Sequence, residues 1–175
     1  MLFLAEPSHE YKESFLEGVR EFQAEGREQY FDLKSISENF DTFLQQLQDQ
    51  KDRSKLPPDL VPSSDFWLID NDEYVGRLSL RHELNEPLLT WGGHIAYEIR
   101  PSKRMRGSGK EILRLGLEKA RELGLHRVLV TCNEDNIGSK KIIEFNGGKL
   151  ENAVHVEGMP VRKLRYWIDI PWRMI

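Results

Sequence analysis

Arg104-Met105-Arg106-Gly107-Ser108-Gly109 separates a strand-like segment from a helix-like one, and this stretch decides the fold. Upstream, residues 94–99 alternate apolar and polar side chains, as a strand with one buried face does. Downstream, apolar residues recur at helical spacing over 112–123, and Gly124 follows where a C-terminal cap is expected. A glycine turn that opens a helix presents unpaired backbone N–H groups and the positive end of the helix dipole. The stretch therefore predicts an anion site suited to phosphate.

The composition of the loop supports phosphate binding but excludes two common phosphate motifs. Gly107 and Gly109 allow a ligand close to the backbone, and positive charge is supplied around them by Lys103, Arg104, Arg106 and Lys110. A P-loop would need glycine at 104 and a hydroxyl residue at 111, where the chain has Arg104 and Glu111. A dinucleotide fingerprint would need a third glycine at 112, which is Ile112.

The pattern that remains, Arg-x-x-Gly-x-Gly, resembles the pyrophosphate-binding signature of the GNAT superfamily of N-acetyltransferases. Its surroundings resemble that family too: a buried-strand run at 127–132 precedes Asn136-Ile137-Gly138-Ser139, which is similar to the family's Asn-x-x-Ala/Ser. A helix-like stretch at 137–145 then ends near Gly147. The phrase at 96–101 looks like the family's central strand. The resemblance covers residues 66–170 well and the first 65 residues more loosely.

Patterning along the rest of the chain gives an element order that matches this family. Strands are expected at 2–6, 66–69, 74–80, 94–100, 127–132, 149–156 and 161–170, and helices from Ser8 to about Phe22, at 37–49, at 112–123 and at 137–145. The prolines in 51–64 make that segment a connecting loop. The expected fold is α/β (an α+β mixed sheet) in the order β-α-α-β-β-β-α-β-α-β-β. We expect one domain over 1–175, with a variable, substrate-side part at 1–65 and an acetyl-CoA-binding core at 66–170.

The resemblance implies acetyl-CoA as co-substrate and a mechanism without a covalent acyl-enzyme. In this family the strands before and after the phosphate-loop helix splay apart, and the freed backbone pairs with the pantetheine arm. A neutral amine attacks the thioester directly, and a main-chain N–H of the first strand stabilises the developing oxyanion. Carried over to this sequence, the cofactor-binding residues are Ile99, Arg100, Arg104, Met105, Arg106, Gly107, Ser108, Gly109, Lys110, Asn136 and Ser139.

Several candidate residues have two interpretations. Asn136 either contacts the cofactor arm or only caps a helix. Ser139 likewise either lies near the cofactor arm or has only a structural role. Glu98 is the candidate catalytic base, because apolar neighbours would raise the pKa of its carboxyl; the alternative is an ion pair with Arg100 or another cation. The family's proton-donating tyrosine position is Ile143, so another tyrosine (Tyr97 or Tyr166) or solvent must protonate the thiolate.

Other residues are expected to be structural. Cys132 lies in an apolar strand and is expected to be a buried, inert thiol. His82, His94 and His126 lack metal-ligand spacing, so no metal site is predicted. The segment Trp91-Gly92-Gly93 is either a substrate-facing bend or an aromatic core plug beside a bulge.

Composition limits the partners. A net charge of −4 argues against general nucleic-acid binding and mildly favours a cationic partner such as an amine. No apolar run approaches membrane-spanning length, and a single cysteine among 175 residues is compatible with a cytoplasmic location. The predicted function is acetyl transfer to a primary amine, on a small molecule or a protein. The alternatives are a protein N-terminal or lysine acetyltransferase, and a non-catalytic acyl-CoA sensor. The sequence leaves the acceptor undetermined, and a homodimer is possible.

Overall fold

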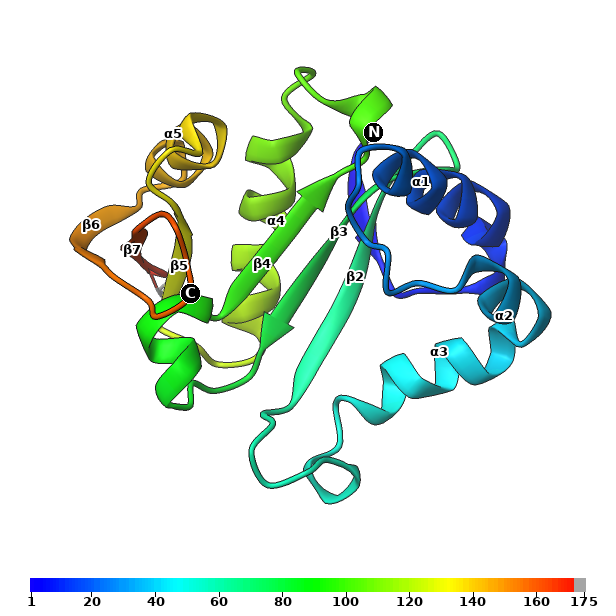
Figure 1. Cartoon of the computed structure of the whole chain (residues 1–175), viewed down its shortest axis with the longest axis horizontal. Coiled ribbons are helices and arrows are strands. Elements are labelled where there is room, and N and C mark those ends of the chain that lie inside the picture. Colours follow the sequence, from blue (N-terminus) through cyan, green and yellow to red (C-terminus); the bar gives the residue numbers. More distant parts are fainter. Residues whose placement is uncertain (172–175) are drawn as a thin grey trace.

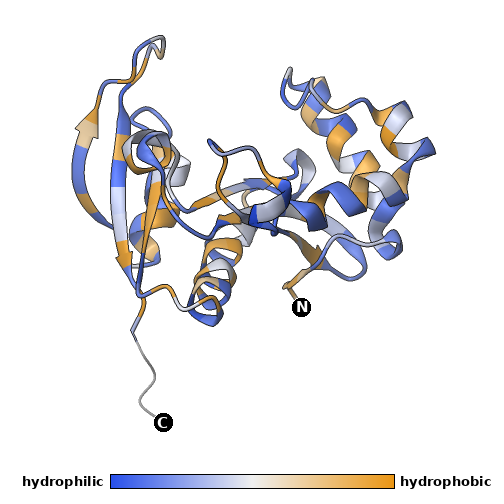
Figure 2. Cartoon of the chain, turned by 90° about the horizontal axis from the view of Figure 1, so that it is seen from below, coloured by the Kyte–Doolittle hydropathy of each residue, from blue (hydrophilic) through white to orange (hydrophobic). Residues whose placement is uncertain are grey.

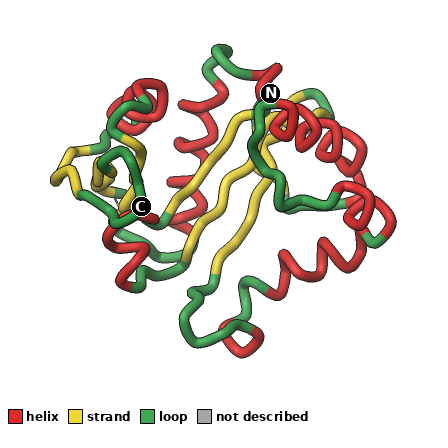
Figure 3. The backbone as a smooth tube through the Cα atoms, viewed as in Figure 1, coloured by secondary structure: helices red, strands yellow, loops and turns green. Residues whose placement is uncertain are grey.

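The computed structural model describes residues 1–171 as two small sheets with helices on both sides (Figures 1 and 3). The strands are β1 (Phe3–Ala5), β2 (Ser63–Asp70), β3 (Glu73–Arg81), β4 (Ile95–Ile99), β5 (Arg127–Asn133), β6 (Lys149–Val154) and β7 (Lys163–Asp169). The helices are α1 (Lys12–Ala24), α2 (Leu33–Glu38), α3 (Phe40–Asp49), α4 (Ser108–Glu122) and α5 (Ile137–Phe145). Short 3-10 turns occupy His9–Tyr11, Arg53–Lys55 and Pro101–Lys103, and a π-helical turn occupies Leu88–Gly92.

The predicted element order is confirmed with one correction in its N-terminal part. The helix expected at 37–49 is two helices, α2 and α3, because Asn39 between them leaves the helical region (φ −124°, ψ 46°). Asp32 begins α2 by accepting a hydrogen bond from the Ser35 N–H, at 3.1 Å. β2 also begins three residues earlier than predicted, at Ser63, because it pairs with β3 along the whole length of the hairpin.

All strand pairs within the two sheets are antiparallel. The first sheet has the order β1-β2-β3-β4 and the second has the order β5-β7-β6. β4 and β5 are neighbours without forming a ladder, so the expected mixed sheet is open along this line. The two strands meet only at their beginnings, where the His94 N–H donates to Leu129 O at 2.7 Å and the Leu129 N–H donates to His94 Nδ1 at 2.9 Å.

The two faces of the first sheet pack against different helices. A core that includes Leu78, Leu113 and Tyr166 lies between both sheets and α4. A second, aromatic core joins α1 and α3 to the opposite face of the first sheet, where Phe15 stacks on Trp67 with ring centroids 4.4 Å apart. Hydrophobic and hydrophilic residues accordingly alternate along most elements (Figure 2).

The helices of the described part do not have the length and apolar composition needed to cross a bilayer. Residues 172–175, the end of the expected 1–175 domain, lie outside the described residues.

Candidate active site

The loop before α4 has the free backbone donors that the sequence predicts. Among residues 1–171, the N–H groups from Met105 through Gly109 donate to no carbonyl, whereas those of Lys110 and Glu111 both donate to Gly107 O. Gly107, the N-cap residue of α4, has a left-handed backbone (φ 84°), and a Cβ there would meet no atom within 4 Å. Several unpaired donors at the positive end of a 15-residue helix form an anion site.

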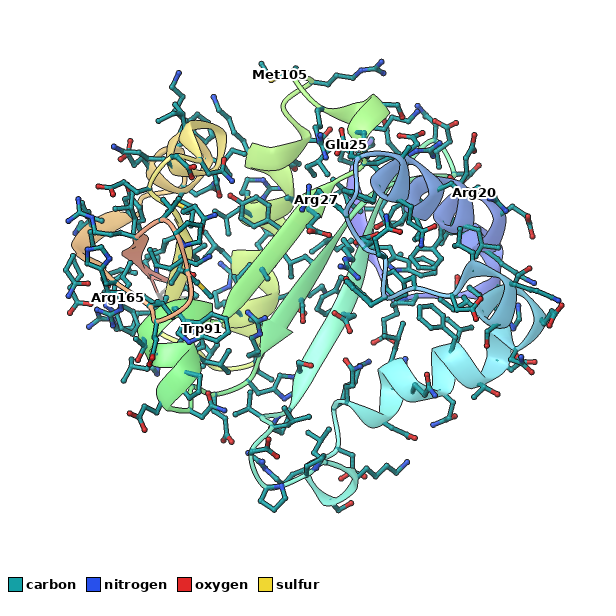
Figure 4. The ribbon with its side chains drawn as sticks, viewed as in Figure 1. Arg20, Glu25, Arg27, Trp91, Met105 and Arg165 are labelled. Atoms are coloured by element: carbon teal, nitrogen blue, oxygen red, sulfur yellow. The ribbon has the colours of Figure 1, made fainter. Side chains whose placement is uncertain are left out.

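The side-chain charges near this loop are mostly engaged elsewhere. Both Nη atoms of Arg104 pair with the Glu25 carboxylate at 2.8 and 2.9 Å, and its Nε donates to Ile99 O. Lys103 pairs with Glu73, and the ammonium of Lys110 lies over the Phe145 ring. Glu25 and Arg27 lie at the side of this loop that faces α1, and Met105 is at its tip (Figure 4). Arg104 thus ties the loop to α1, whereas Arg106 is exposed and forms no ion pair with another residue of 1–171.

Glycine is needed at Gly107 and at Gly109 for different physical reasons. Gly107 is required by its positive φ. A Cβ at Gly109 would instead lie 2.5 Å from Cδ1 of Ile142 on α5. The absent side chain thus lets α4 and α5 pack closely, and Gly109 also lines the cleft, so the interpretation that it admits a ligand stays a prediction. Ser108 is buried at the start of α4.

Between β4 and β5 lies a cleft made of two connecting cavities. One, of about 270 Å³, begins at the loop and is lined by Ile99, Arg104, Met105 and Gly109, together with Arg27, Glu98, Gly138 and Ile142. The other, of about 290 Å³, extends toward Trp91 and is lined by Arg81, Thr131 and Cys132. Tyr97, Asn136 and Ser139 line both cavities and so mark the point where they meet.

A hydroxyl pair spans the cleft at this junction. The Tyr97 hydroxyl of β4 lies 3.0 Å from Oγ of Ser139 on α5. Burial raises the pKa of Tyr97 to about 12, so the phenol remains protonated near neutral pH. Asn136 accepts a hydrogen bond from the Ser139 N–H at 3.0 Å, which confirms its role as helix cap while leaving it beside the cleft.

Three residues behave as the sequence predicts. Ile143 is fully buried in the core, so it offers no proton. Cys132 is buried and burial raises the pKa of its thiol to about 11, which keeps it protonated and inert. His94 joins the two sheets through its ring nitrogen, and burial lowers its pKa to about 4. The described residues contain no group of side chains suited to a metal ion.

Glu98 differs from its predicted state. Burial raises the pKa of its carboxyl, but a hydrogen bond with Glu28 and the charges of Arg77 and Arg27 outweigh burial, and the pKa lies below its ordinary value. Glu98 pairs with Arg27 and with Arg77, whose Nη2 lies 3.1 Å away. The ion-pair alternative is therefore confirmed, with these two arginines in place of Arg100. Glu28, at a strained φ of 52°, lies 2.7 Å from the same Nη2 of Arg77.

Arg100 does not belong to the cleft. Its N–H donates to Val75 O and its carbonyl accepts from Lys103, so its backbone is already paired. Its buried guanidinium bonds Glu21 on α1 at 2.8 Å. Successive residues of a strand direct their backbone groups to opposite edges, so the donors that face the cleft are the N–H groups of Tyr97 and Ile99.

The sequence analysis did not predict a site on the face of the first sheet that carries Arg77, Ser79 and Arg81, which we call the outer face. Two cavities there, of about 350 and 520 Å³, share Gln50, Ser79 and Arg81. Trp91 is 38% exposed and lines the cleft, so the core-plug interpretation of its segment is wrong, and the substrate-facing interpretation stays a prediction. The alternation of β3 could have identified Arg77, Ser79 and Arg81 as one polar face.

Comparison with known proteins gives one family and one fold. A family model described as an acetyltransferase (GNAT) domain matches residues 17–149. No curated protein shows a significant sequence match to this chain.

Several solved structures share this fold at low sequence identity. The self-immunity acetyltransferase MccE, in complex with acetyl-CoA and AMP, has a TM-score of 0.70 at 14% identity over 97% of this chain and 92% of that one. An acetyltransferase from Salmonella typhimurium that modifies the N-terminal serine of a ribosomal protein has a TM-score of 0.68 at 18% identity, covering 97% and 95%. RimJ of Mycobacterium smegmatis, in complex with CoA-disulfide, also has a TM-score of 0.68 at 18% identity, covering 96% and 81%.

Proposed function

Since the chain belongs to the GNAT acetyltransferase family, we propose that it transfers the acetyl group of acetyl-CoA to a primary amine by direct attack in a ternary complex. The observation that carries this proposal is the continuous path from the unpaired N–H groups before α4 into the cleft between β4 and β5. An anion site at one end and a hydroxyl pair at the middle of one cleft suit a long phosphorylated thioester.

The residues of the loop fit the diphosphate of this co-substrate. The N–H groups of Met105 through Gly109 would bind its oxygens, and Arg106 would add a cation. The N–H groups of Tyr97 and Ile99 at the open edge of β4 would pair with the amide groups of its pantetheine arm. Arg104 would act by holding the loop in place through Glu25, because its guanidinium is already paired.

At the junction of the cavities, Tyr97 and Ser139 would supply the proton for the departing thiolate. Attack forms a C–N bond and breaks the C–S bond, and the sulfur then needs one proton. Burial holds the phenol in its protonated form, and the contact with Ser139 gives that proton a path along two hydroxyls. The backbone N–H at the edge of β4 would stabilise the oxyanion.

The attacking amine must also lose a proton. Glu98 lines the cleft, but its ion pairs make it a weak candidate for the base that accepts this proton. The carboxylate lines the cleft, yet two arginines hold it ionised and engaged. We therefore assign Glu98 to the ion-pair cluster first, with proton transfer through water as its only route to the amine.

A protein N-terminal acetyltransferase is the second candidate, supported by the neighbours that modify ribosomal-protein termini. The alternative from another class is an acyl-CoA sensor. A thiol-release assay with acetyl-CoA and a panel of small amines, amino acids and N-terminal peptides separates the three. Release with small amines or amino acids supports the first candidate, and release with N-terminal peptides alone supports the second. Calorimetric binding of acetyl-CoA without release on any acceptor supports the sensor.

A further inference from the structure

The outer face of the first sheet carries an ordered set of polar side chains beside the cleft. Strand register places Asp65, Ser79 and Ala96 side by side across β2, β3 and β4. Because alternate residues share a face, Arg81 lies one step along β3 on the same side. The small side chains of Ser79 and Ala96 form the floor of a hollow, and Arg81 stands at one end of it.

Arg81 connects this hollow to the thioester cleft. It lines the cleft cavity beside Trp91 and also both cavities on the outer face. A group bound to Arg81 therefore lies within reach of the point where the acetyl group is expected. This connection follows from shared lining residues and does not depend on how the cofactor is placed.

The guanidinium of Arg81 has N–H groups that donate no hydrogen bond to the described residues. Its Nη1 atom donates to the carbonyls of Gly92 and Gly93, at 3.1 and 3.3 Å. No carboxylate of the described residues lies within 4.0 Å of it, and Nε and Nη2 have no partner there. Arg77, the other arginine of this face, differs: it contacts Glu28, Glu98 and the Tyr30 hydroxyl. Arg81 is attracted by the charge of Asp65 without reaching ion-pair distance, and burial still lowers the pKa of its guanidinium, so an anion that pairs directly with it gains binding energy.

A carboxyl group also lines this hollow. Asp65 lines the same cavity and forms no ion pair with Arg81. Burial raises the pKa of Asp65 against a hydrogen bond from Ser79. A cation and a carboxyl group that face one cavity without pairing complement a ligand that carries charges of both signs.

We propose that the acceptor is an amine that also carries a carboxylate, an amino acid in its free form, whose carboxylate binds Nε and Nη2 of Arg81. These two atoms form the side of the guanidinium that matches a carboxylate with two parallel hydrogen bonds. The acceptor's amino group then lies over Ser79 and Ala96, toward Tyr97. This inference rests on the proposed function and names its substrate class.

The test compares twenty L-amino acids with their carboxamides, which keep the amine and remove the anion. Thiol release with acetyl-CoA should give the best free acid a kcat/KM at least about 10-fold above that of its amide. Arg81→Gln should abolish that ratio by lowering the value for the acid alone, and Arg81→Lys should restore part of it. A purely structural Arg81 would lower both values together.

Arg165 provides the matched control. It also donates to a carbonyl of the π-helical turn, Leu89 O at 3.0 Å, but it is paired with Glu151 on the second sheet. In Figure 4 it lies near the same turn as Trp91. Arg165→Gln should leave the acid-to-amide ratio unchanged. A change of ratio as large as that of Arg81→Gln would contradict the assignment.

Calorimetry with CoA-saturated protein separates a failure of this inference from a failure of the proposed function. Binding of a free amino acid that weakens about 10-fold or more in its amide and in Arg81→Gln supports the inference even where no acetyl is transferred. Amides or N-terminal peptides that bind and react as well as free acids, independently of Arg81, overturn it. Failure of every free acid to bind also overturns it.

Discussion

At the scale of single residues, the proposed proton donor comes from a different element than the family's tyrosine position, which holds an aliphatic side chain. Ile143 is part of the core, and the phenol that reaches the cleft comes from β4 instead, as Tyr97. The sequence could name Tyr97 and Tyr166 as candidates but could not choose between them, because the choice depends on which one contacts the cleft.

Tyr97→Phe should lower kcat by about 10- to 100-fold with little change in acetyl-CoA affinity, since it removes a proton donor and keeps the ring. Tyr166→Phe is the control: its hydroxyl also bonds another element, Glu144 at 3.0 Å, but does not line the cleft. Steady-state kinetics and calorimetry measure both effects. Because the pKa of Tyr97 is raised to about 12, wild-type activity should show no alkaline limb from this phenol below about pH 10. Equal losses of kcat in the two variants would remove Tyr97 from the mechanism.

The sign of the Glu98 shift was predicted wrongly because its partners come from distant parts of the chain. Only its apolar neighbours in β4 are visible in the sequence. Glu28 and Arg27 approach from the segment after α1, and Arg77 approaches from β3. The hydrogen bond with Glu28 and the charges of the two arginines together outweigh burial and lower the pKa of Glu98. Glu98→Gln should therefore lower the melting temperature by several degrees while leaving the chemical step nearly intact. Thermal unfolding and kcat at the pH optimum check this; a large kcat loss in a stable variant would return Glu98 to the role of base.

Glu28 gives the cluster a pH dependence. Burial, followed by the neighbouring Glu98, raises the pKa of Glu28 from 4.5 to about 8. Between these two values the unfolded chain releases this proton and the folded chain keeps it, so this group makes folding less favourable as pH rises. Glu28→Gln should remove that penalty and increase stability near pH 8 by on the order of 1 kcal/mol, with little effect at pH 4. Denaturant unfolding at the two pH values tests it, and an equal gain at both would exclude titration as the cause.

At the scale of elements, the bounds of a helix could be predicted where the local sequence pattern sets them. They could not be predicted where the local pattern continues through a break. The helix at 137–145 was predicted at its observed bounds, since Asn136 caps it and its apolar spacing is regular. The break at Asn39 was missed because the apolar pattern continues through it. The open line between β4 and β5 was expected from the family resemblance alone. In the structure, the close contact at Gly93, His94 and Leu129 holds the two strands together at one end of this line.

That contact leaves no space for a side chain at Gly93. It has a φ of 70°, and a Cβ would lie 2.6 Å from the backbone oxygen of Leu129. Gly93→Ala should destabilise the protein by about 3 kcal/mol or more, because backbone strain and a backbone clash add. Gly26→Ala is the matched control, with a φ of 79° and open space, and should cost only about 1–2 kcal/mol. Equal losses in denaturant unfolding would show that the sheets do not depend on this approach.

At the scale of the whole molecule, two half-sheets held together at one end form the cleft, and α4 presents its N-terminus to the open end (Figure 1). The N-terminal helices are attached to the same region through Glu21 and Glu25, which bond Arg100 and Arg104. The family, the element order and the loop could be predicted from short local patterns. The acceptor face could not, because Asp65, Ser79 and Arg81 become neighbours only through strand register.

The central claim, that the loop before α4 binds the diphosphate of acetyl-CoA, is tested most directly by calorimetry on two glycine variants of one helix. Gly107 and Gly124 lie at opposite ends of α4 with φ values of 84° and 90° and open space around each. Changing either to Glu adds the same strain and charge, but only Gly107→Glu places them at the anion site. We predict that Gly107→Glu weakens acetyl-CoA binding at least about 100-fold while Gly124→Glu leaves it unchanged. A folded Gly107→Glu protein with wild-type affinity would contradict the account.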